Sequence, residues 1–411
     1  MQYKTLISLF TGSGGLDIGL TESGFTTRLC VEIDNDAKKT IRVNHPKWNI
    51  AEPGDIHMIT PLEILKQAGL KPKELTLLAG GPPCQPFSKS GYWASGDSAR
   101  LADPRSNTLG AYLNVVRVTL PEILLLENVK GISFKNKNEG MDYLLCGLEE
   151  INQETGSNYK AKVVILNAAD YGVPQLRERV FIIAHREGKE FFMPESTHGL
   201  VRQKGLEPYR TAWDAIGDLD TKTWTKDLDA QGKWGRLLPS IPEGKNYQWH
   251  TVKMDGMPLF GWRTRFWSFL LKLSKSQPSW TIQAQPGPAT GPFHWKGRQL
   301  SIRELARLQT FPDHIEFVGD KRSKIRQIGN AVPPAIGEIF GLEFCRQFMG
   351  EKVCKTLSLI PKVRLNCPPP EKIKPVPKEY IALRGNYEEH PGVGRGPGAV
   401  KRKNKASGII E

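Results

Sequence analysis

Leu6–Gly15 reads LISLFTGSGG, a short apolar run that passes directly into a glycine-rich turn. Further apolar runs of this kind are found at Leu29–Ile33, Leu75–Ala79, Ile123–Leu126, Ala161–Leu166 and Val180–Ala184. Most spacers between them are long enough for a crossover helix, so the pattern predicts an α/β fold with a doubly wound, mostly parallel sheet. Sheets of this kind bind their ligands beyond the carboxyl ends of the strands.

The glycine-rich turn departs from the dinucleotide-binding fingerprint G-x-G-x-x-G. The pattern starts at Gly12, but Asp17 stands where the last glycine should be. Glu32 follows the second apolar run and is suited to accept hydrogen bonds from ribose hydroxyls. A glycine loop without phosphate-binding features and a ribose-binding carboxylate together predict a phosphate-free nucleoside cofactor, for which S-adenosylmethionine is the obvious candidate. The alternative is a tight strand-to-helix turn that binds no ligand.

A cysteine on a stiff loop is the second unusual feature. Gly80–Ser88 reads GGPPCQPFS and follows the third apolar run, so Cys84 is flanked by three prolines. Proline fixes the backbone and prevents the segment from continuing as a helix. A lone cysteine is more often a small buried apolar residue. A thiol held rigidly at the ligand-binding edge of the sheet instead indicates a nucleophile.

Composition limits the class of protein. The chain has 411 residues, of which 39% are hydrophobic and 24% charged, and its net charge is +14. These values indicate a globular protein of two or three domains, and the charge favours a polyanionic partner. No apolar run approaches the roughly 20 residues of a membrane span, and no signal peptide is recognisable, so a soluble, cytoplasmic protein is expected. The six cysteines lack CxxC or metal-ligand spacing, so neither a metal site nor a disulfide framework is expected.

The texture of the sequence changes along the chain. Eight of the ten tryptophans fall between residues 187 and 297, interleaved with basic residues and without clear periodicity, which indicates a second, smaller and irregular domain. The last part of the chain is rich in proline and basic residues and is expected to be extended or partly disordered. The predicted ranges are 1–186 for the first domain, completed by 320–350, then 187–297 for the second domain, 298–319 for a connecting segment, and 351–411 for the tail.

Two helices are expected after the irregular domain. Ser301–Leu308 reads SIRELARL, and Ser301 with Glu304 gives the S-x-x-E capping-box pattern of a helix start. A further helix is expected over Ile336–Met349, after Pro334.

Six motifs follow one another in a characteristic order. After FTGSGG and GGPPCQPFS come Glu127-Asn-Val129, Gln175-Leu-Arg-Glu-Arg179, the RELARLQTFPD segment that begins at Arg303, and Gln327-Ile-Gly-Asn-Ala-Val-Pro-Pro334. With this set the chain, over about residues 4–345, resembles the DNA cytosine-5 methyltransferases of prokaryotic restriction–modification systems. The resemblance implies a Rossmann-like, S-adenosylmethionine-dependent methyltransferase domain and a target-recognition domain over 187–297.

The resemblance also implies catalytic roles. Cys84 would add to C6 of cytosine and thereby activate C5 toward a methyl group, and Glu127 would act as the donor at N3. Arg179 would contact the cytosine O2 and Glu127, and Arg177 would lie near the phosphate or near Cys84. On an extended segment these two arginines should face the same side. The alternatives are a solvated carboxylate at a strand end for Glu127 and a solvated pair of arginines at a sheet edge.

Cofactor contacts follow from the same resemblance. Phe10 is expected against the adenine, and Glu32 with Ile33 at the ribose. Asp55, with Ile56 beside it, matches an adenine-contacting position, although Asp55 could equally be a helix cap. Asn330 is expected to return to the same pocket. The loop expected against the methionine part consists of Thr11, Gly12, Ser13, Gly14 and Gly15.

The expected partner is double-stranded DNA, bound by a monomer, and a cognate restriction endonuclease is implied only functionally. The cytosine must leave the duplex to meet Cys84, and Gln85 and Ser88 are placed where they could contact the flipped nucleotide. The candidates for recognition contacts in the irregular domain are Arg263, Arg265 and Thr281, and the alternative for the arginines is a solvated basic rim around a tryptophan core.

Two other functions fit the same motifs less well. A tRNA cytosine-5 methyltransferase would use the same chemistry, but such enzymes tend to have a short middle region with a Cys-Phe-Thr element, and residues 187–297 contain no cysteine. A catalytically inactive DNA-binding regulator should have lost Cys84, Glu127 or Arg179, and all three are present.

Overall fold

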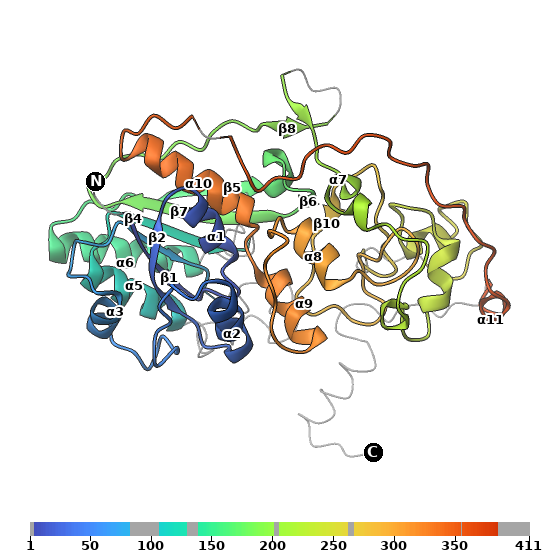
Figure 1. Ribbon diagram of the computed structural model, residues 1–411, viewed down its shortest axis with the longest axis horizontal. Coiled ribbons are helices and arrows are strands. Elements are labelled where there is room, and N and C mark those ends of the chain that lie inside the picture. The colour runs from blue at the N-terminus through green and yellow to red at the C-terminus, as the bar shows by residue number, and fades with distance from the viewer. Residues whose placement is uncertain are drawn as a thin grey trace, which may run out of the picture. The chain divides into compact units, whose positions relative to one another are not determined.

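The computed structural model describes residues 4–82, 107–129, 139–200, 205–261, 267–354 and 356–384 (Figure 1). These residues form two compact units. Unit 1 draws on the ranges Met1–Asp220, Ser276–Gln285 and Ser301–Asn366, and unit 2 on Thr221–Lys275, Pro286–Leu300 and Cys367–Glu411. The border within the chain therefore lies at Asp220, later than the start of the predicted middle domain at residue 187.

A six-stranded sheet is the centre of unit 1. Its order is β2-β1-β3-β4-β7-β5, in which the first four strands are parallel and β7 runs antiparallel to both β4 and β5. The predicted doubly wound, mostly parallel sheet is thus confirmed, and each of the six apolar runs is a strand. The strands are β1 (Thr5–Leu9), β2 (Thr26–Val31), β3 (Leu77–Gly80), β4 (Ile123–Asn128), β5 (Lys162–Asn167) and β7 (Glu178–His185).

Apolar residues on both faces of this sheet create two cores. Successive side chains of a strand point to opposite faces, so Leu6 belongs to one core and Ile7 to the other. The core with Ile7 is covered by α3 (Pro61–Ala68), α5 (Asn107–Thr119) and α6 (Glu139–Thr155). The core with Leu6 is covered by α1 (Gly15–Glu22) and α10 (Pro334–Gln347).

Helices α1 and α10 lie side by side although they are far apart in the sequence (Figure 1). Glycines permit this close approach: a Cβ on Gly19 would lie 1.9 Å from the Pro334 carbonyl oxygen, and one on Gly337 would lie 2.3 Å from the Leu16 oxygen. The chain that ends in α10 therefore returns to the sheet of unit 1. The helix expected over Ile336–Met349 is confirmed by α10, with bounds that differ by two residues at each end.

The remaining elements connect the sheet to its surroundings. Helix α8 (Ile302–Leu308) begins with the predicted capping box, in which the Glu304 N–H donates to Ser301 Oγ and the Ser301 N–H donates to the Glu304 carboxylate. The other helices are α2 (Asn35–Asn44), α7 (Ala212–Ile216), α9 (Lys321–Asn330) and α11 (Lys378–Ile381). The short strands are β6 (Gln175–Leu176), β8 (His198–Gly199), β9 (Glu207–Pro208) and β10 (Ser279–Trp280). The 3-10 turns are η3 (Ala168–Tyr171), η4 (Gly217–Leu219), η5 (Lys226–Leu228), η6 (Gly235–Ser240) and η7 (Tyr247–His250).

Unit 2 has little regular structure, in keeping with its weak periodicity. Its described part consists mainly of turns and 3-10 segments packed around one apolar cluster. Aromatic rings supply much of that cluster: the Trp234 ring meets the Phe260 and Tyr380 rings at centroid distances of 5.0 and 5.7 Å. Since large aromatic side chains bury much apolar surface, they can hold an irregular chain together.

Residues 356–384 of the predicted tail are packed in the two units. In unit 1 the Glu338 carboxylate of α10 accepts the Ser358 and Leu359 backbone N–H groups at 2.9 and 3.0 Å. In unit 2 Tyr380 is buried, and its hydroxyl donates to the Lys233 carbonyl oxygen at 2.7 Å. Although most of its side chains are exposed, this part of the tail is therefore anchored at particular points by part-buried hydrogen bonds and by the buried Tyr380 side chain.

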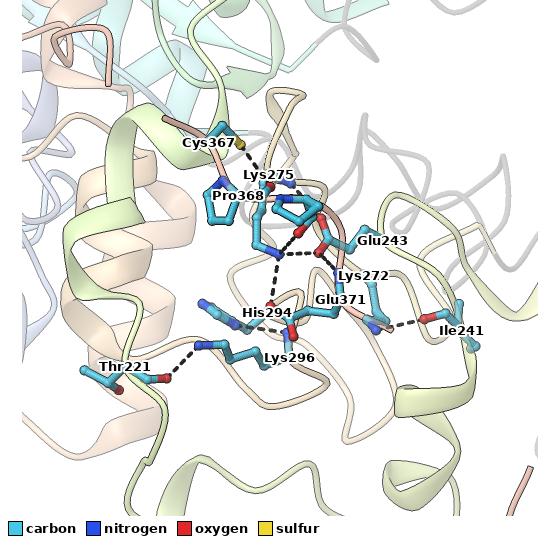
Figure 2. Close-up of polar contacts among 11 residues, drawn as sticks. Thr221, Ile241, Glu243, Lys272, Lys275, His294, Lys296, Cys367, Pro368 and Glu371 are labelled. Carbon is cyan, nitrogen blue, oxygen red and sulfur yellow. Dashed lines mark hydrogen bonds and ion pairs between the residues drawn. The ribbon is translucent and has the colours of Figure 1, made fainter. Parts of the chain in front are cut away.

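A buried charge cluster fastens the tail within unit 2 (Figure 2). Lys275 is 2% exposed, and its ammonium group lies 2.7 Å from the Glu243 carboxylate and 3.0 Å from that of Glu371. It also donates to the Pro369 carbonyl oxygen at 3.2 Å. The Glu371 N–H in turn donates to Glu243 at 2.8 Å. One ammonium group thus joins the body of unit 2 to the segment that begins at residue 367.

Replacing Lys275 by methionine is expected to destabilise unit 2 by about 3 kcal/mol, because two carboxylates lose their buried counter-ion. Urea unfolding followed by tryptophan fluorescence measures this, since most described tryptophans belong to unit 2. Arg236→Met is the control: Arg236 pairs with Glu379 at 2.9 Å, but their side chains are 78% and 42% exposed, so a loss below about 1 kcal/mol is expected. Equal losses for the two variants would contradict the special role of the buried cluster.

Candidate active site

A cavity of about 580 Å³ lies in unit 1 at the carboxyl ends of β1 to β4, where α9 and the following turn also reach. Many of the residues predicted from the sequence line it. They are Phe10, Thr11, Gly12, Gly15, Glu32, Ile33, Asp55, Ile56, Glu127, Arg179 and Asn330. Ser13, Gly14, Arg177 and Thr281 are described but do not line it. Cys84, Gln85, Ser88, Arg263 and Arg265 lie outside the described residues.

The loop between β1 and α1 adopts the left-handed conformations that its glycines permit. Gly12 and Gly14 have φ values of 58° and 81°, and Phe10 has a φ of 57°, which is uncommon for a non-glycine residue. A Cβ placed on Gly12 would meet no atom within 4 Å. Gly12 therefore leaves open space along the cavity, and a ligand can approach the backbone there.

Glu32 ties the glycine loop to the end of β2. One carboxylate oxygen accepts the Gly12 N–H at 2.6 Å and the other accepts the Asp34 N–H at 2.7 Å. Burial raises the pKa of Glu32, and these backbone donors oppose that rise. Each carboxylate oxygen has a second lone pair, so Glu32 can hold the loop and still accept hydrogen bonds from a ligand.

The rest of this pocket is more open. Ile33 is 66% exposed and presents an apolar surface to the cavity. The Asp55 carboxylate accepts the His57 N–H at 2.9 Å within a turn; it caps no helix, since the following helix α3 is capped by Thr60. Gly54 allows this segment to approach β2, because a Cβ there would lie 2.0 Å from the Glu32 carbonyl oxygen. Asn330 is exposed at the end of α9.

A buried ion pair forms a second part of the cavity wall. Arg179 Nε lies 2.9 Å from Glu127 Oε1, and the two side chains are 15% and 12% exposed. Glu127 stands near the end of β4 and Arg179 near the start of the neighbouring strand β7, so the sheet itself brings them together. Burial raises the pKa of Glu127, while the charges of Arg179 and Arg177 oppose that rise.

The segment that leads toward Cys84 starts beside this pair. Gly80, Gly81 and Pro82 line the same cavity. A Cβ on Gly81 would lie 3.2 Å from Glu127 Oε2, so the missing side chain lets the backbone run close to that carboxylate. In the sequence Cys84 follows Pro82 by two residues.

Arg177 does not line the cavity but holds the backbone of residues that do. Its side chain is fully buried, and its Nη2 donates to the carbonyl oxygens of Gly329 and Ala331, both at 2.9 Å. Gly329 and Ala331 line the cavity, whereas Arg177 does not. Burial lowers the pKa of Arg177, and the neighbouring charge of Arg179 adds to this.

Thr281 contacts the same motif. Its hydroxyl donates to the Leu176 carbonyl oxygen at 2.7 Å, and the Ile282 N–H donates to the Gln175 side chain at 3.0 Å. Strand β10 runs parallel to β6 just before these contacts. The Thr-Ile segment therefore braces the Gln175–Arg179 motif within unit 1.

Two features of the cavity were not predicted from the sequence. Asp17 lines the cavity and is 1% exposed, although the sequence identified it only as a break in the dinucleotide fingerprint. Asp34 caps α2 and pairs with Arg326 of α9 at 2.6 Å. For Asp17 the only signal in the sequence was an acidic residue at a position where the fingerprint has glycine. Asp34 and Arg326 are too far apart in the sequence for any local pattern to link them.

Across the described ranges, no group of three or more His, Cys, Asp or Glu residues is arranged to hold a metal ion. No helix in the same ranges combines the length and apolar character needed to cross a membrane.

The fold is shared with methyltransferases of known structure. A prophage-encoded protein of E. coli, described as a "putative DNA modification methyltransferase", superposes with a TM-score of 0.58 at 22% identity, covering 84% of this chain and 99% of that one. A family model described as C-5 cytosine-specific DNA methylase matches residues 4–344. This chain belongs to that family, and it is a DNA cytosine-5 methyltransferase.

Two relatives are similar in sequence as well. The type II methyltransferase M.SacI of Streptomyces achromogenes is 39% identical over 362 residues, which cover 81% of this chain and 90% of that protein. The type II methyltransferase M.AquIA of Picosynechococcus is 43% identical over 230 residues, or 54% of this chain and 90% of that protein.

Proposed function

We propose that this chain methylates C5 of a cytosine within a specific sequence of double-stranded DNA, and that Cys84 is the nucleophile. The observation that carries the proposal is the buried Glu127–Arg179 pair. It lies in the same cavity as the Gly12–Glu32 contact and beside the Gly81–Pro82 backbone that leads to Cys84. One cavity therefore offers a polarising pair for a pyrimidine and a pocket for a nucleoside.

The proposed chemistry begins with the thiolate. Cytosine C5 is a weak nucleophile, so Cys84 Sγ forms a bond to C6, and the electrons of the C5–C6 double bond become available at C5. Negative charge also develops toward N3 and O2. Glu127, whose pKa is raised by burial, supplies a proton at N3. Arg179 stabilises O2 and holds Glu127 in place.

Turnover requires the adduct to break down. After C5 has gained the methyl group, its proton leaves to a base, the C5–C6 double bond forms again, and Cys84 departs as a thiolate, while the N3 proton returns to Glu127. No side chain of the described residues is assigned to that proton, and water is the proposed base. The target base must first leave the duplex, at a cost of a few kcal/mol, and Gln85 and Ser88 are the proposed contacts to the displaced nucleotide.

The residues of the cavity fit S-adenosylmethionine as the cofactor, which supplies an electrophilic methyl group when bound. The open space at Gly12 admits a ligand beside the backbone. Glu32 has lone pairs for ribose hydroxyls, and Phe10, Ile33 and Ile56 offer apolar surface for a base. Asp55 and Asn330 are the proposed polar contacts. The methionine part is assigned to the loop of Thr11, Gly12, Ser13, Gly14 and Gly15.

Replacing Glu32 by alanine is expected to weaken S-adenosylmethionine binding about 10- to 100-fold, because a charge-assisted acceptor for the ribose is lost and the Gly12 loop loses its tether. Isothermal titration calorimetry gives the dissociation constant. The dissociation constant for duplex DNA, measured for the same variant, should change by less than about threefold. An unchanged cofactor dissociation constant would remove Glu32 from the ribose site.

Recognition of the DNA sequence is assigned to the irregular region over 187–297. Its mixture of basic and aromatic residues suits phosphate and base contacts, and Arg263 and Arg265 are the proposed contact residues. Thr281 acts instead through its contact with Leu176, bracing the Arg177–Arg179 segment.

We further infer that the enzyme acts as a monomer in a prokaryotic cytoplasm, as the modification partner of a restriction endonuclease. The type II names of the relatives support only the modification role in this inference.

Sequencing for 5-methylcytosine in plasmid DNA from cells that express this chain tests the proposal. The expected result is methylation of one cytosine within one short sequence, and no methylation when Cys84 is replaced. Unmodified plasmid DNA together with new 5-methylcytosine in tRNA would contradict it and favour the RNA substrate.

A further inference from the structure

Asp17 is a buried carboxylate that the proposed catalytic scheme does not use. It lies in the first turn of α1, lines the cavity and is 1% exposed. Its Oδ1 atom has no hydrogen-bond partner among the described residues. The Ser8 side chain supplies a hydrogen bond to the carboxylate, so the group is half satisfied.

Such a group is costly unless something compensates for it. Burying an incompletely paired carboxylate is unfavourable, and burial raises the pKa of Asp17 to about 6. Within the described part of the chain, no cationic side chain acts on Asp17. Its nearest titratable neighbours include the buried Cys30 thiol, and Glu32 of the same cavity is also acidic. The amino end of α1 contributes only the partial positive charge of its backbone.

The position of Asp17 points to a ligand of opposite charge. It stands two residues after Gly15, on α1, at the position where the dinucleotide-binding fingerprint has its last glycine. A carboxylate here would repel a phosphate. The methionine part of S-adenosylmethionine carries a sulfonium, an ammonium and a carboxylate group, so its net charge is positive.

We propose that Asp17 is the counter-ion for the cationic methionine part of the cofactor and selects a positively charged, phosphate-free nucleoside. This inference rests on the proposed function. In this scheme Glu32 binds the ribose and the apolar residues of the cavity contact the base, whereas Asp17 recognises the positive charge of the methionine part. The positive charge of the ligand then balances the charge of Asp17, which no cationic side chain of the described residues does.

Asp17→Asn in the full chain tests the inference, because it removes the charge and keeps the shape. S-adenosylmethionine should bind at least about tenfold more weakly, whereas adenosine, which lacks the methionine part, should bind within about twofold of the wild-type value. Titration calorimetry measures both. Equal losses for both ligands would indicate a structural role, and no loss for either would also overturn the inference.

Glu338→Gln is the matched control. Glu338 is also a fully buried carboxylate of unit 1, but its oxygens accept Ser358 and Leu359 N–H groups and it does not line the cavity. Its replacement can lower the unfolding midpoint but should leave the ratio of the two dissociation constants unchanged. A shift in that ratio equal to the shift in Asp17→Asn would contradict the inference.

A ligand pair tests the same point without a variant. Wild-type protein should bind the dimethylsulfonium derivative of 5′-deoxyadenosine at least about tenfold more tightly than the neutral 5′-methylthioadenosine. Equal affinity would overturn the inference. If the wild-type chain binds neither these ligands nor S-adenosylmethionine, the proposed cofactor itself is wrong, which is a separate result.

Discussion

Cys84→Ser is expected to lower the rate of DNA methylation by about a thousandfold or more, which corresponds to a loss of about 4 kcal/mol of transition-state stabilisation. A serine hydroxyl is far less acidic than a thiol and does not form the nucleophilic anion at neutral pH. Without addition to C6, cytosine C5 has no means of accepting the methyl group. Single-turnover incorporation of labelled methyl groups into a duplex that contains the target sequence measures the rate.

Two controls make this result specific. Binding of the same duplex should remain within a few-fold of the wild-type value, because the phosphate and base contacts are assigned elsewhere. Cys146→Ser should methylate normally, since Cys146 is an exposed cysteine on α6 and away from the cavity. Retained turnover in Cys84→Ser would remove Cys84 from the mechanism.

Glu127→Gln is expected to lower the single-turnover rate about 100- to 1,000-fold. A glutamine amide can still donate a hydrogen bond, but it cannot transfer a proton to N3 or carry the charge that pairs with Arg179. The reason for a large effect is the burial of the site, which makes each lost electrostatic interaction worth more than in water.

The matched control for this variant is Glu122→Gln. Glu122 precedes the other end of β4 and contacts His185 at 3.5 Å, and it does not line the cavity. Its replacement should leave the rate within about twofold. Equal losses for the two variants would indicate that Glu127 acts only through the stability of the sheet.

The sequence predicted the strands well because each is a short apolar run bounded by glycine, proline or polar residues. It did not predict that β7 is antiparallel and lies between β4 and β5. The run at Val180–Ala184 is buried on both faces, and a uniformly apolar pattern contains no information about direction or neighbours.

The site could be predicted where a motif ends a strand. Glu32, Glu127 and Arg179 all line the cavity because the carboxyl ends of parallel strands, and the start of an antiparallel one, meet at one edge. The support given by Arg177 was not predictable, because its partners are the carbonyl oxygens of Gly329 and Ala331, more than 150 residues away. Backbone carbonyls have no sequence signature.

The packing of the tail was missed for a related reason. A basic, Pro-rich composition is typical of a solvated segment, and the contact of Lys275 with Glu371 joins residues 96 positions apart. Composition reports average burial, whereas particular contacts hold this segment: the Lys275–Glu371 ion pair, the hydrogen bonds of Glu338 to Ser358 and Leu359, and the buried Tyr380 side chain.

Trapping with 5-fluorocytosine tests the central claim most directly. Fluorine replaces the C5 proton that must leave after methyl transfer, so Cys84 cannot be eliminated and the enzyme stays bonded to the base. A duplex with 5-fluorocytosine at the target position should form, with S-adenosylmethionine present, a denaturation-resistant complex whose peptide mass places the nucleotide and one methyl group on Cys84. If the unfluorinated duplex is methylated while the fluorinated one forms no such adduct, attack of a thiolate on cytosine C6 is contradicted.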